Sequence, residues 1–162
     1  MSRVKTYTPK EVSIAWYGIQ FSGLGEDTMV SITRNSDNST PTVGAQGVIQ
    51  HVKSADLTGT LEVTLLQNSE TNIYLTNIQL LQDNNSDLFF GNMTVTDPSG
   101  GQLWDCRDAH LMKSADCVLG SGHNAKTYTF YIDECVAAGA NSEIASALGI
   151  ASRINAAAGL LG

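Results

Sequence analysis

Hydrophobic and polar residues alternate along several short stretches of this chain, a pattern typical of strands with one buried face. The clearest stretch covers residues 58–67. Its apolar side chains share one face: Leu61, Val63 and Leu65. Its polar side chains share the other face: Thr60, Glu62 and Thr64. We therefore predict a strand here, with its apolar face turned toward a core.

The same alternation predicts further strands, separated by turns that are often rich in glycine: residues 12–17, 19–21, 29–34, 91–97, 102–112 and 126–136. In the last of these, two sets of side chains alternate: Tyr128, Phe130 and Ile132 against Thr127, Thr129, Tyr131 and Asp133. The turn Pro98-Ser-Gly-Gly joins strands 91–97 and 102–112, so we expect these two to form a hairpin. The predicted fold class is mainly β, with strands outnumbering helices.

After strand 58–67 the sequence predicts one α-helix. Ser69 is a favourable N-cap, and Glu70 lies in the first turn, where the helix dipole stabilises a negative charge. Apolar residues gather on one arc: Ile73, Tyr74, Ile78, Leu80 and Leu81. Polar residues lie opposite: Thr71, Asn72, Gln79 and Gln82. We expect the apolar arc to pack on a sheet, and Leu75, on the polar side, to be free to meet a partner.

Residues 35–56 form a long polar segment between two predicted strands. Loops beyond ~12–15 residues are usually functional or disordered, and β character returns around Gly44 and Gly47. We interpret the segment as an extended arm or long hairpin that becomes ordered on a neighbouring molecule. A mobile surface loop is the alternative.

The length of 162 residues favours one domain. We assign residues 1–136 to this β domain. From residue 137 the composition shifts to Ala, Gly and Ile, so residues 137–162 are interpreted as a C-terminal appendage. Ser142 is positioned to cap a helix with one apolar stripe: Ile144, Leu148, Ala151 and Ile154.

The charge balance argues against a surface that holds phosphate groups. Sixteen acidic residues face nine basic ones, giving a net charge of −7, whereas nucleic-acid binders cluster Lys and Arg. Charged residues make up only 15% of the chain, below the usual ~25%. Either other copies of the chain cover much of the exterior, or the exterior is simply rich in Thr and Asn.

The apolar runs are too short to span a membrane. The first residues do not resemble a secretory signal, and three scattered cysteines suit synthesis in a reducing cytoplasm.

Few residues suggest chemistry. The one metal-like spacing consists of Cys106, His110, Cys117 and His123, which lacks the close Cys and His pairs of usual zinc sites. A small metal-dependent enzyme using these residues is therefore a weak alternative. No nucleophile elbow or phosphate-binding loop is present in the sequence. We expect no catalytic residue, no bound metal and no cofactor.

Hydroxyl side chains recur on the polar positions of the predicted strands: Ser31, Thr33, Thr60, Thr64, Thr94, Thr96, Thr127 and Thr129. Together with Glu62 and Asp133 they would give one sheet face that is hydroxylated and mildly acidic. Such a wall would be wetted without retaining a polyanion, because like charges repel and neutral hydroxyls bind weakly. An ordinary solvent-facing sheet of high β propensity is the alternative.

Several motifs occur in the order and spacing of a known family. They are Lys5-Thr-Tyr-Thr-Pro-Lys-Glu-Val-Ser-Ile, then Ile19 and Gly23, then Met29-Val-Ser-Ile-Thr-Arg-Asn-Ser-Asp, Val43-Gly-Ala-Gln-Gly and Leu57-Thr-Gly-Thr-Leu-Glu-Val-Thr-Leu-Leu-Gln-Asn-Ser-Glu-Thr-Asn. With these motifs, roughly residues 4–136 resemble a bacteriophage tail tube protein of contractile-tailed phages.

The resemblance implies a two-sheet β-sandwich or barrel with one flanking α-helix. It further implies homo-hexameric rings whose strands join into an inner β-barrel, stacked into a tube through which double-stranded DNA passes without specific binding. The expected location is the virion tail, and the expected partners are sheath, baseplate and tail terminator proteins. Lumen-facing residues are expected at Thr60, Glu62, Thr64, Thr129 and Asp133. Residues of the inter-subunit loop are expected at Asp37, Val43, Gly44, Gly47 and His51.

Two alternatives to a phage tube remain open at this point. The first is the tube of a tailocin or a secretion-type injection system, which would share nearly all of these features. The second is a monomeric β-sandwich that binds a ligand such as a carbohydrate.

Overall fold

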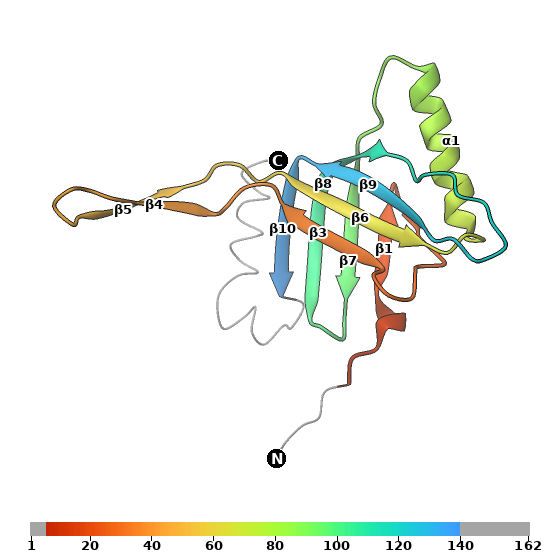
Figure 1. The fold of residues 1–162 in the computed structure, drawn as a ribbon, viewed down its shortest axis with the longest axis horizontal. Coiled ribbons are helices and arrows are strands. Elements are labelled where there is room, and N and C mark those ends of the chain that lie inside the picture. The colour runs from red at the N-terminus through yellow and green to blue at the C-terminus, as the bar shows by residue number, and fades with distance from the viewer. Residues whose placement is uncertain (1–5, 140–162) are drawn as a thin grey trace.

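The computed structural model describes residues 6–139, and within them β-strands predominate (Figure 1). The strands are β1 (Ser13–Trp16), β2 (Ile19–Gln20), β3 (Val30–Arg34), β4 (Ser39–Val43), β5 (Ile49–Lys53), β6 (Gly59–Leu65), β7 (Gly91–Asp97), β8 (Gln102–Lys113), β9 (Lys126–Ile132) and β10 (Glu134–Gly139). The helices are the α-helix α1 (Glu70–Asn84) and a short 3-10 helix, Pro9–Glu11. The predicted mainly-β fold with one flanking helix is confirmed.

The body consists of two antiparallel sheets that share strand β8. In the first sheet the strand order is β2-β1-β7-β8, with β10 pairing on the other side of β8. In the second sheet the order is β8-β9-β6-β3. The predicted hairpin of β7 and β8 is confirmed, with Asp97 paired to Gln102 next to the turn. Strands β2, β3 and β10 therefore lie at sheet edges.

Strand β8 changes sheets at Asp108. This residue has a positive φ of 51°, which is uncommon for a residue with a side chain. Before it, Cys106 pairs with Met93 of β7; after it, Leu111 pairs with Phe130 of β9. The bend folds the two sheets toward each other, so the face of each sheet that lies inside the bend encloses the core.

The core lies between the two sheets and the inner side of α1. The fully buried side chains come from both layers: Ile14, Trp16, Met93 and Cys106 from the first sheet, Leu61, Val63, Leu65, Phe130 and Ile132 from the second. Trp16 and Phe130 meet edge to face with ring centroids 5.0 Å apart, an arrangement that adds to the burial energy. The alternation predicted for residues 58–67 is confirmed in β6.

Helix α1 begins at the predicted N-cap, where the Ser69 Oγ accepts a hydrogen bond from the Thr71 amide at 3.2 Å. The predicted packing face is only partly correct: Tyr74 and Ile78 of the predicted arc pack against the core. Leu75 is fully buried, whereas three residues of the predicted apolar arc are exposed: Ile73 (66%), Leu80 (57%) and Leu81 (48%). Leu75 is thus an anchor of the helix and is not free to meet a partner.

The physical reason for this rotation is a set of hydrogen bonds from the polar face of α1 to the body. The Thr71 Oγ1 accepts from the Ser22 amide at 2.9 Å. The Asn72 side chain donates to the Leu66 carbonyl at 2.7 Å. At the far end Gln82 donates to the Leu111 carbonyl at 3.3 Å. These bonds give partners to the Thr71 hydroxyl and to the amide nitrogens of Asn72 and Gln82, and they hold the polar face inward. The Asn72 Oδ1 and the Gln82 Oε1 are buried without a hydrogen-bond partner among the described residues.

The predicted strand 126–136 is two strands in the structure. β9 ends at Ile132, Asp133 forms a bend, and β10 continues to Gly139. The break follows from the bend of β8, because β9 pairs with one half of β8 and β10 with the other. The helix predicted from Ser142 lies outside the described residues.

The long segment 35–56 forms a hairpin. Among the described strands, β4 and β5 pair only with each other as a two-stranded sheet, and the hairpin projects sideways from the body (Figure 1). All ten residues of the two strands are exposed. Of the two readings of this segment, the long hairpin is the one that the structure adopts.

Candidate functional site

The outer face of the second sheet carries a continuous hydroxyl surface. Neighbouring strands place their polar residues side by side: Ser31 beside Glu62 beside Thr129, and Thr33 beside Thr60 beside Tyr131. The Thr64 and Thr127 hydroxyls lie 3.2 Å apart. We call this set the hydroxyl face: Ser31, Thr33, Thr60, Glu62, Thr64, Thr127 and Thr129. The structure thus brings together four of the five residues that the sequence analysis expected to face a lumen.

The hydroxyl face offers weak, neutral contacts with one negative charge near its centre. Glu62 is exposed on the central strand β6, and hydroxyl residues occupy the paired positions on both sides. The Thr60 Oγ1 donates to the Asn35 Oδ1 at 3.0 Å, which fixes one end of the face. Hydroxyl groups of this kind hold water and hydrogen-bond small polar groups, but they cannot neutralise a phosphate backbone.

Three other predicted residues lie apart from this face. Asp133 is exposed at the bend between β9 and β10, outside either strand. Thr94 and Thr96 belong to β7 of the first sheet, where Thr94 pairs with Asp105. The expectation of a single hydroxylated sheet face is therefore wrong for β7, because the chain places β7 in the other layer of the sandwich.

The five residues predicted for the inter-subunit loop lie on or beside the β4–β5 hairpin. Asp37 precedes β4, Val43 ends it, and His51 pairs with Pro41 across the hairpin. Gly44 and Gly47 form the tip, where the Gly44 amide donates to the Val48 carbonyl at 2.8 Å. Gly47 has a φ of +83°, a conformation that other residues rarely adopt.

The hairpin exposes an unusual amount of apolar surface for a segment that stands away from the core. Its exposed fractions are high: Val43 (65%), Val48 (61%), Ile49 (60%) and Val52 (62%). Within residues 39–53 the ionisable side chains are His51 and Lys53. The hairpin is therefore apolar and weakly basic in a chain whose net charge is −7.

A network around Asp56 fixes the base of the hairpin. The Asp56 carboxylate accepts hydrogen bonds from the Ser36 hydroxyl, from the Thr58 hydroxyl at 2.7 Å and from the Thr58 amide at 3.0 Å. Those bonds, with a smaller contribution from the Arg34 charge, lower the pKa of Asp56 to about 2. Arg34 also donates to the Asn38 side chain at 2.9 Å. The hairpin thus leaves the body from an anchored base.

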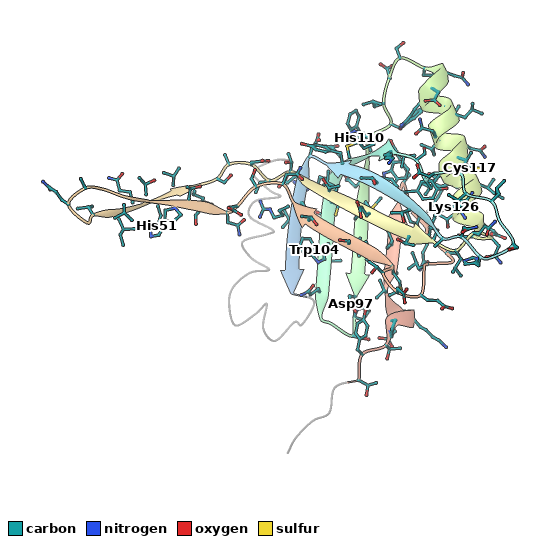
Figure 2. The ribbon with its side chains drawn as sticks, in the orientation of Figure 1. His51, Asp97, Trp104, His110, Cys117 and Lys126 are labelled. Carbon is teal, nitrogen blue, oxygen red and sulfur yellow. The ribbon has the colours of Figure 1, made fainter. Side chains whose placement is uncertain are left out.

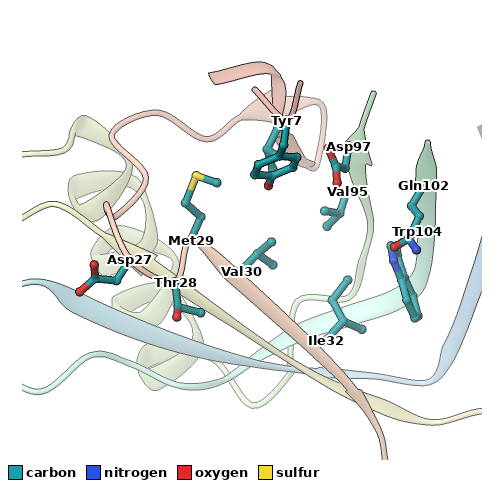
Figure 3. Close-up of a pocket in the computed structure, with 11 residues that line it drawn as sticks. Tyr7, Asp27, Thr28, Met29, Val30, Ile32, Val95, Asp97, Gln102 and Trp104 are labelled. Carbon is teal, nitrogen blue, oxygen red and sulfur yellow. The ribbon is translucent and has the colours of Figure 1, made fainter. Parts of the chain in front are cut away.

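A groove of about 390 Å³ opens between the edge of the second sheet and the β7–β8 end of the first sheet (Figure 3). Its apolar lining comes from both sheets: Val12, Met29, Val30, Ile32, Val95 and Trp104. Tyr7 lies over one end, and the polar lining residues include Asp27, Asp97 and Gln102. Sequence analysis missed this groove. The alternation showed that Val30 and Ile32 share a face, but it contained no signal for what that face would meet.

The residues of the weak zinc hypothesis are not assembled into a site. Cys106 is buried and Cys117 is exposed, and Figure 2 shows Cys117 and His110 apart from each other. His110 lies between the rings of Phe90 and Tyr131, at centroid distances of 5.1 and 5.7 Å. Among residues 6–139 there is no group of three or more His, Cys, Asp or Glu side chains arranged to hold a metal ion.

Cys106 instead lies opposite Cys135 of strand β10. Contact with the Cys135 thiol, together with burial, raises the pKa of Cys106. Cys106 is thus buried beside Cys135 in the core, whereas Cys117 is exposed. In addition, no helix within the described part of the chain is long and apolar enough to cross a membrane.

Solved structures support the fold. The chain resembles the sheath/tube terminator of an extracellular contractile injection system, PVC, with a TM-score of 0.54 at 10% identity, covering 85% of this chain and 100% of that one. It also resembles the chain from the PVC sheath–tube complex, with a TM-score of 0.52 at 10% identity, covering 83% and 92%. The tube-terminating cap of the anti-feeding prophage gives a TM-score of 0.51 at 9% identity, covering 86% and 95%. At such low identity these likenesses show a shared fold.

Sequence relatives identify the family. The chain is 32% identical over 117 residues to "Structural protein ORF10" of Pseudomonas phage KPP10, covering 67% of each. Residues 6–137, nearly all of the described domain, match the family described as bacteriophage PhiTE tail tube protein. The resemblance noted in the motifs is thereby confirmed, and the chain belongs to this family of phage tail tube proteins.

Proposed function

We propose that this protein is the subunit of stacked hexameric rings that form the tail tube and conduct the phage genome. The proposal rests on two features of the described residues: an edge strand that lacks a second partner strand, and an exposed hairpin. Within residues 6–139, strand β3 pairs on one side only, with β6. Unpaired edge strands are templates for pairing with another chain. A closed ring would satisfy them, because each subunit's edge would meet that of its neighbour.

The hydroxyl face is proposed to line the lumen of the tube. In this arrangement Thr60, Glu62, Thr64 and Thr129 face the passing DNA. Asp133, at the bend between β9 and β10 and outside the hydroxyl face, is also proposed to face the lumen. Double-stranded DNA binds surfaces that release its counterions through Lys and Arg. A wall of hydroxyl groups and carboxylates offers no cationic group to bind the phosphates, so the genome can slide along it.

The β4–β5 hairpin is proposed to contact another subunit. Asp37, Val43, Gly44, Gly47 and His51 are the residues assigned to this contact. An isolated two-stranded hairpin is marginally stable in water, and here its apolar side chains are exposed. Contact with a neighbouring copy would remove them from water and stabilise the hairpin.

Membership of the family and the likeness to tube and terminator chains support the remaining assignments. The tube is proposed to bind sheath, baseplate and tail terminator proteins in the virion, after synthesis in the host cytoplasm. Its role is structural and non-enzymatic. A tube of a tailocin or a secretion-type system would use the same surfaces.

Imaging the purified protein tests the proposal. We expect six-fold rings or rods by negative-stain microscopy, and a concentration-dependent rise in mass by light scattering. A protein that remains monomeric at every concentration, also in the presence of its tail partners, would contradict the proposal and favour a monomeric binding module.

The lumen assignment has its own test. Tubes of Glu62→Lys assembled in the presence of a short DNA duplex should retain the DNA at low salt and release it at high salt. Asp87→Lys, at an exposed loop position, is the matched control with the same change of charge. Equal retention of DNA by the two variants would contradict the assignment of the hydroxyl face to the lumen.

A further inference from the structure

We infer that one face of the β4–β5 hairpin docks into the groove between β3 and the β7–β8 end of a second copy of the chain. This inference rests on the proposed assembly and adds the surface that receives the hairpin. The groove is the cavity of about 390 Å³ described above. The occupant is the hairpin face defined in the next paragraph.

Cross-strand pairing decides which hairpin residues share a face. Residues directly opposite each other in an antiparallel pair lie on the same side, and the side alternates along each strand. One face, which we call the docking face, therefore contains three pairs: Val43 with Ile49, Pro41 with His51, and Ser39 with Lys53. The other face contains Thr42 with Gln50 and Thr40 with Val52. The docking face is apolar near the tip and basic near the base.

The groove has the complementary chemistry. Its floor is apolar and includes Val30 and Ile32 of β3 and Trp104 of β8 (Figure 3). Among the described residues that line it, two are aspartates, Asp27 and Asp97, and none is Lys, Arg or His. Strand β3 lies along one side, and no strand of the described part of the chain pairs with its outer edge.

Charge complementarity selects the hairpin as the occupant. The body of the protein is acidic overall, so a random pairing of two surfaces would bring like charges together. Residues 39–53 of the hairpin contain basic side chains and no acidic one. Residues 117–132 share this property, but they include strand β9, which is paired on both sides within the body. His51 and Lys53 would meet the acidic groove, while Val43 and Ile49 would meet its apolar floor.

The contact must join two molecules. In Figure 2, His51 lies on the projecting hairpin, well away from Asp97 and Trp104 of the same chain. The base of the hairpin is fixed by the Asp56 and Arg34 network, which holds the hairpin pointing outward. A hairpin that reaches this groove while that network stays intact must therefore come from a second copy.

Cross-linking of two singly substituted proteins tests the inference. Ile49→Cys and Gln102→Cys, both at exposed positions, are prepared in a Cys117→Ser background, mixed, and treated with a short bismaleimide. We expect a heterodimeric cross-link that grows with protein concentration. The matched control is Gln50→Cys, the adjacent residue on the opposite face of the hairpin, which should give about a tenth of the yield if docking favours one face by ~1.4 kcal/mol.

Charge reversal provides an independent measurement. His51→Glu with Lys53→Glu should raise the concentration needed for association about tenfold, since like charges would then meet. Asp27→Lys with Asp97→Lys should do the same, and combining all four substitutions should restore association. Circular dichroism of each variant checks that the body stays folded, which matters because the Asp97 Oδ1 accepts a hydrogen bond from the Gly100 amide.

The outcomes separate this inference from the proposed function. Rods that form without the cross-link between positions 49 and 102 overturn the docking inference and leave the tube intact. Cross-linked pairs that never grow into rings or rods support the docking contact and contradict the tube. Cross-linking of position 102 to a Leu148→Cys in the C-terminal segment, and not to position 49, assigns the groove to that segment and overturns the inference. A chain that neither associates nor cross-links contradicts both.

Discussion

Strands β6 and β9 and strands β4 and β5 are two antiparallel pairs with regular register, but their surroundings differ completely. Along β6, Leu61, Val63 and Leu65 are fully buried. Along β4 and β5 every residue is exposed, although Val43 and Ile49 are as apolar as those three buried residues of β6. The backbone pairing is therefore similar in both regions, and the difference lies in what covers the side chains. The body supplies its own cover, whereas no other part of the described chain covers the hairpin.

Hydrogen exchange should show the largest difference between the two regions. In the monomer, amides of β6 and β9 should exchange only through global unfolding, which costs about 5–15 kcal/mol in a typical domain. Amides of β4 and β5 should exchange at least about a thousandfold faster, because local opening exposes no core. On assembly the hairpin amides should become protected. Equal protection of the two regions in a verified monomer would contradict the conclusion that the hairpin is uncovered in the single chain.

Truncation of a core side chain should destabilise the monomer strongly. Phe130→Ala removes a fully buried ring that contacts Trp16, and we expect a loss of about 3–5 kcal/mol in the free energy of unfolding. The matched change in the hairpin, Ile49→Ala, should alter it by no more than ~0.5 kcal/mol. Urea unfolding followed by circular dichroism measures both. Similar losses would mean that the hairpin packs on its own body.

The N-cap of α1 should have an intermediate effect. Ser69→Ala removes the acceptor of the Thr71 amide and a donor to the Ser22 carbonyl, and we expect a loss of about 1 kcal/mol. Ser86→Ala, at an exposed position beyond the end of the helix, serves as the control and should change stability by less than ~0.5 kcal/mol. A neutral Ser69→Ala would mean that other contacts of the polar face position the helix.

Titration of Asp56 should give the smallest effect, confined to the base of the hairpin. Its pKa in the folded chain is about 2, against about 3.9 in an unfolded chain. Because the folded pKa is the lower one, the stabilisation is complete above pH ~4 and is lost as the pH falls toward 2. An NMR titration of the Asp56 carboxyl carbon measures this. Thr58→Ala should move the pKa toward its usual value, and an unchanged pKa in that variant would contradict the hydrogen-bond network.

Local sequence patterns predicted much of the sandwich correctly. Alternation located β6 and β9, the Pro98-Ser-Gly-Gly turn located the β7–β8 hairpin, and Ser69 located the start of α1. These features depend on neighbours within a few residues along the chain. The hydroxyl face over β3, β6 and β9 was predicted for the same reason, since alternation decides which residues oppose the core.

The sequence by itself therefore determined where most strands lie, where the helix begins and which hydroxyl residues of β3, β6 and β9 face away from the core, because each depends on neighbours within a few residues along the chain. Only the tertiary structure decided which face of α1 packs, since that depends on Ser22, Leu66 and Leu111, which lie elsewhere in the chain. The break at Asp133 likewise depends on the bend of β8 at Asp108. The groove exists because β3 leaves part of the first sheet uncovered, and the relative placement of two sheets depends on long-range packing that no local pattern encodes.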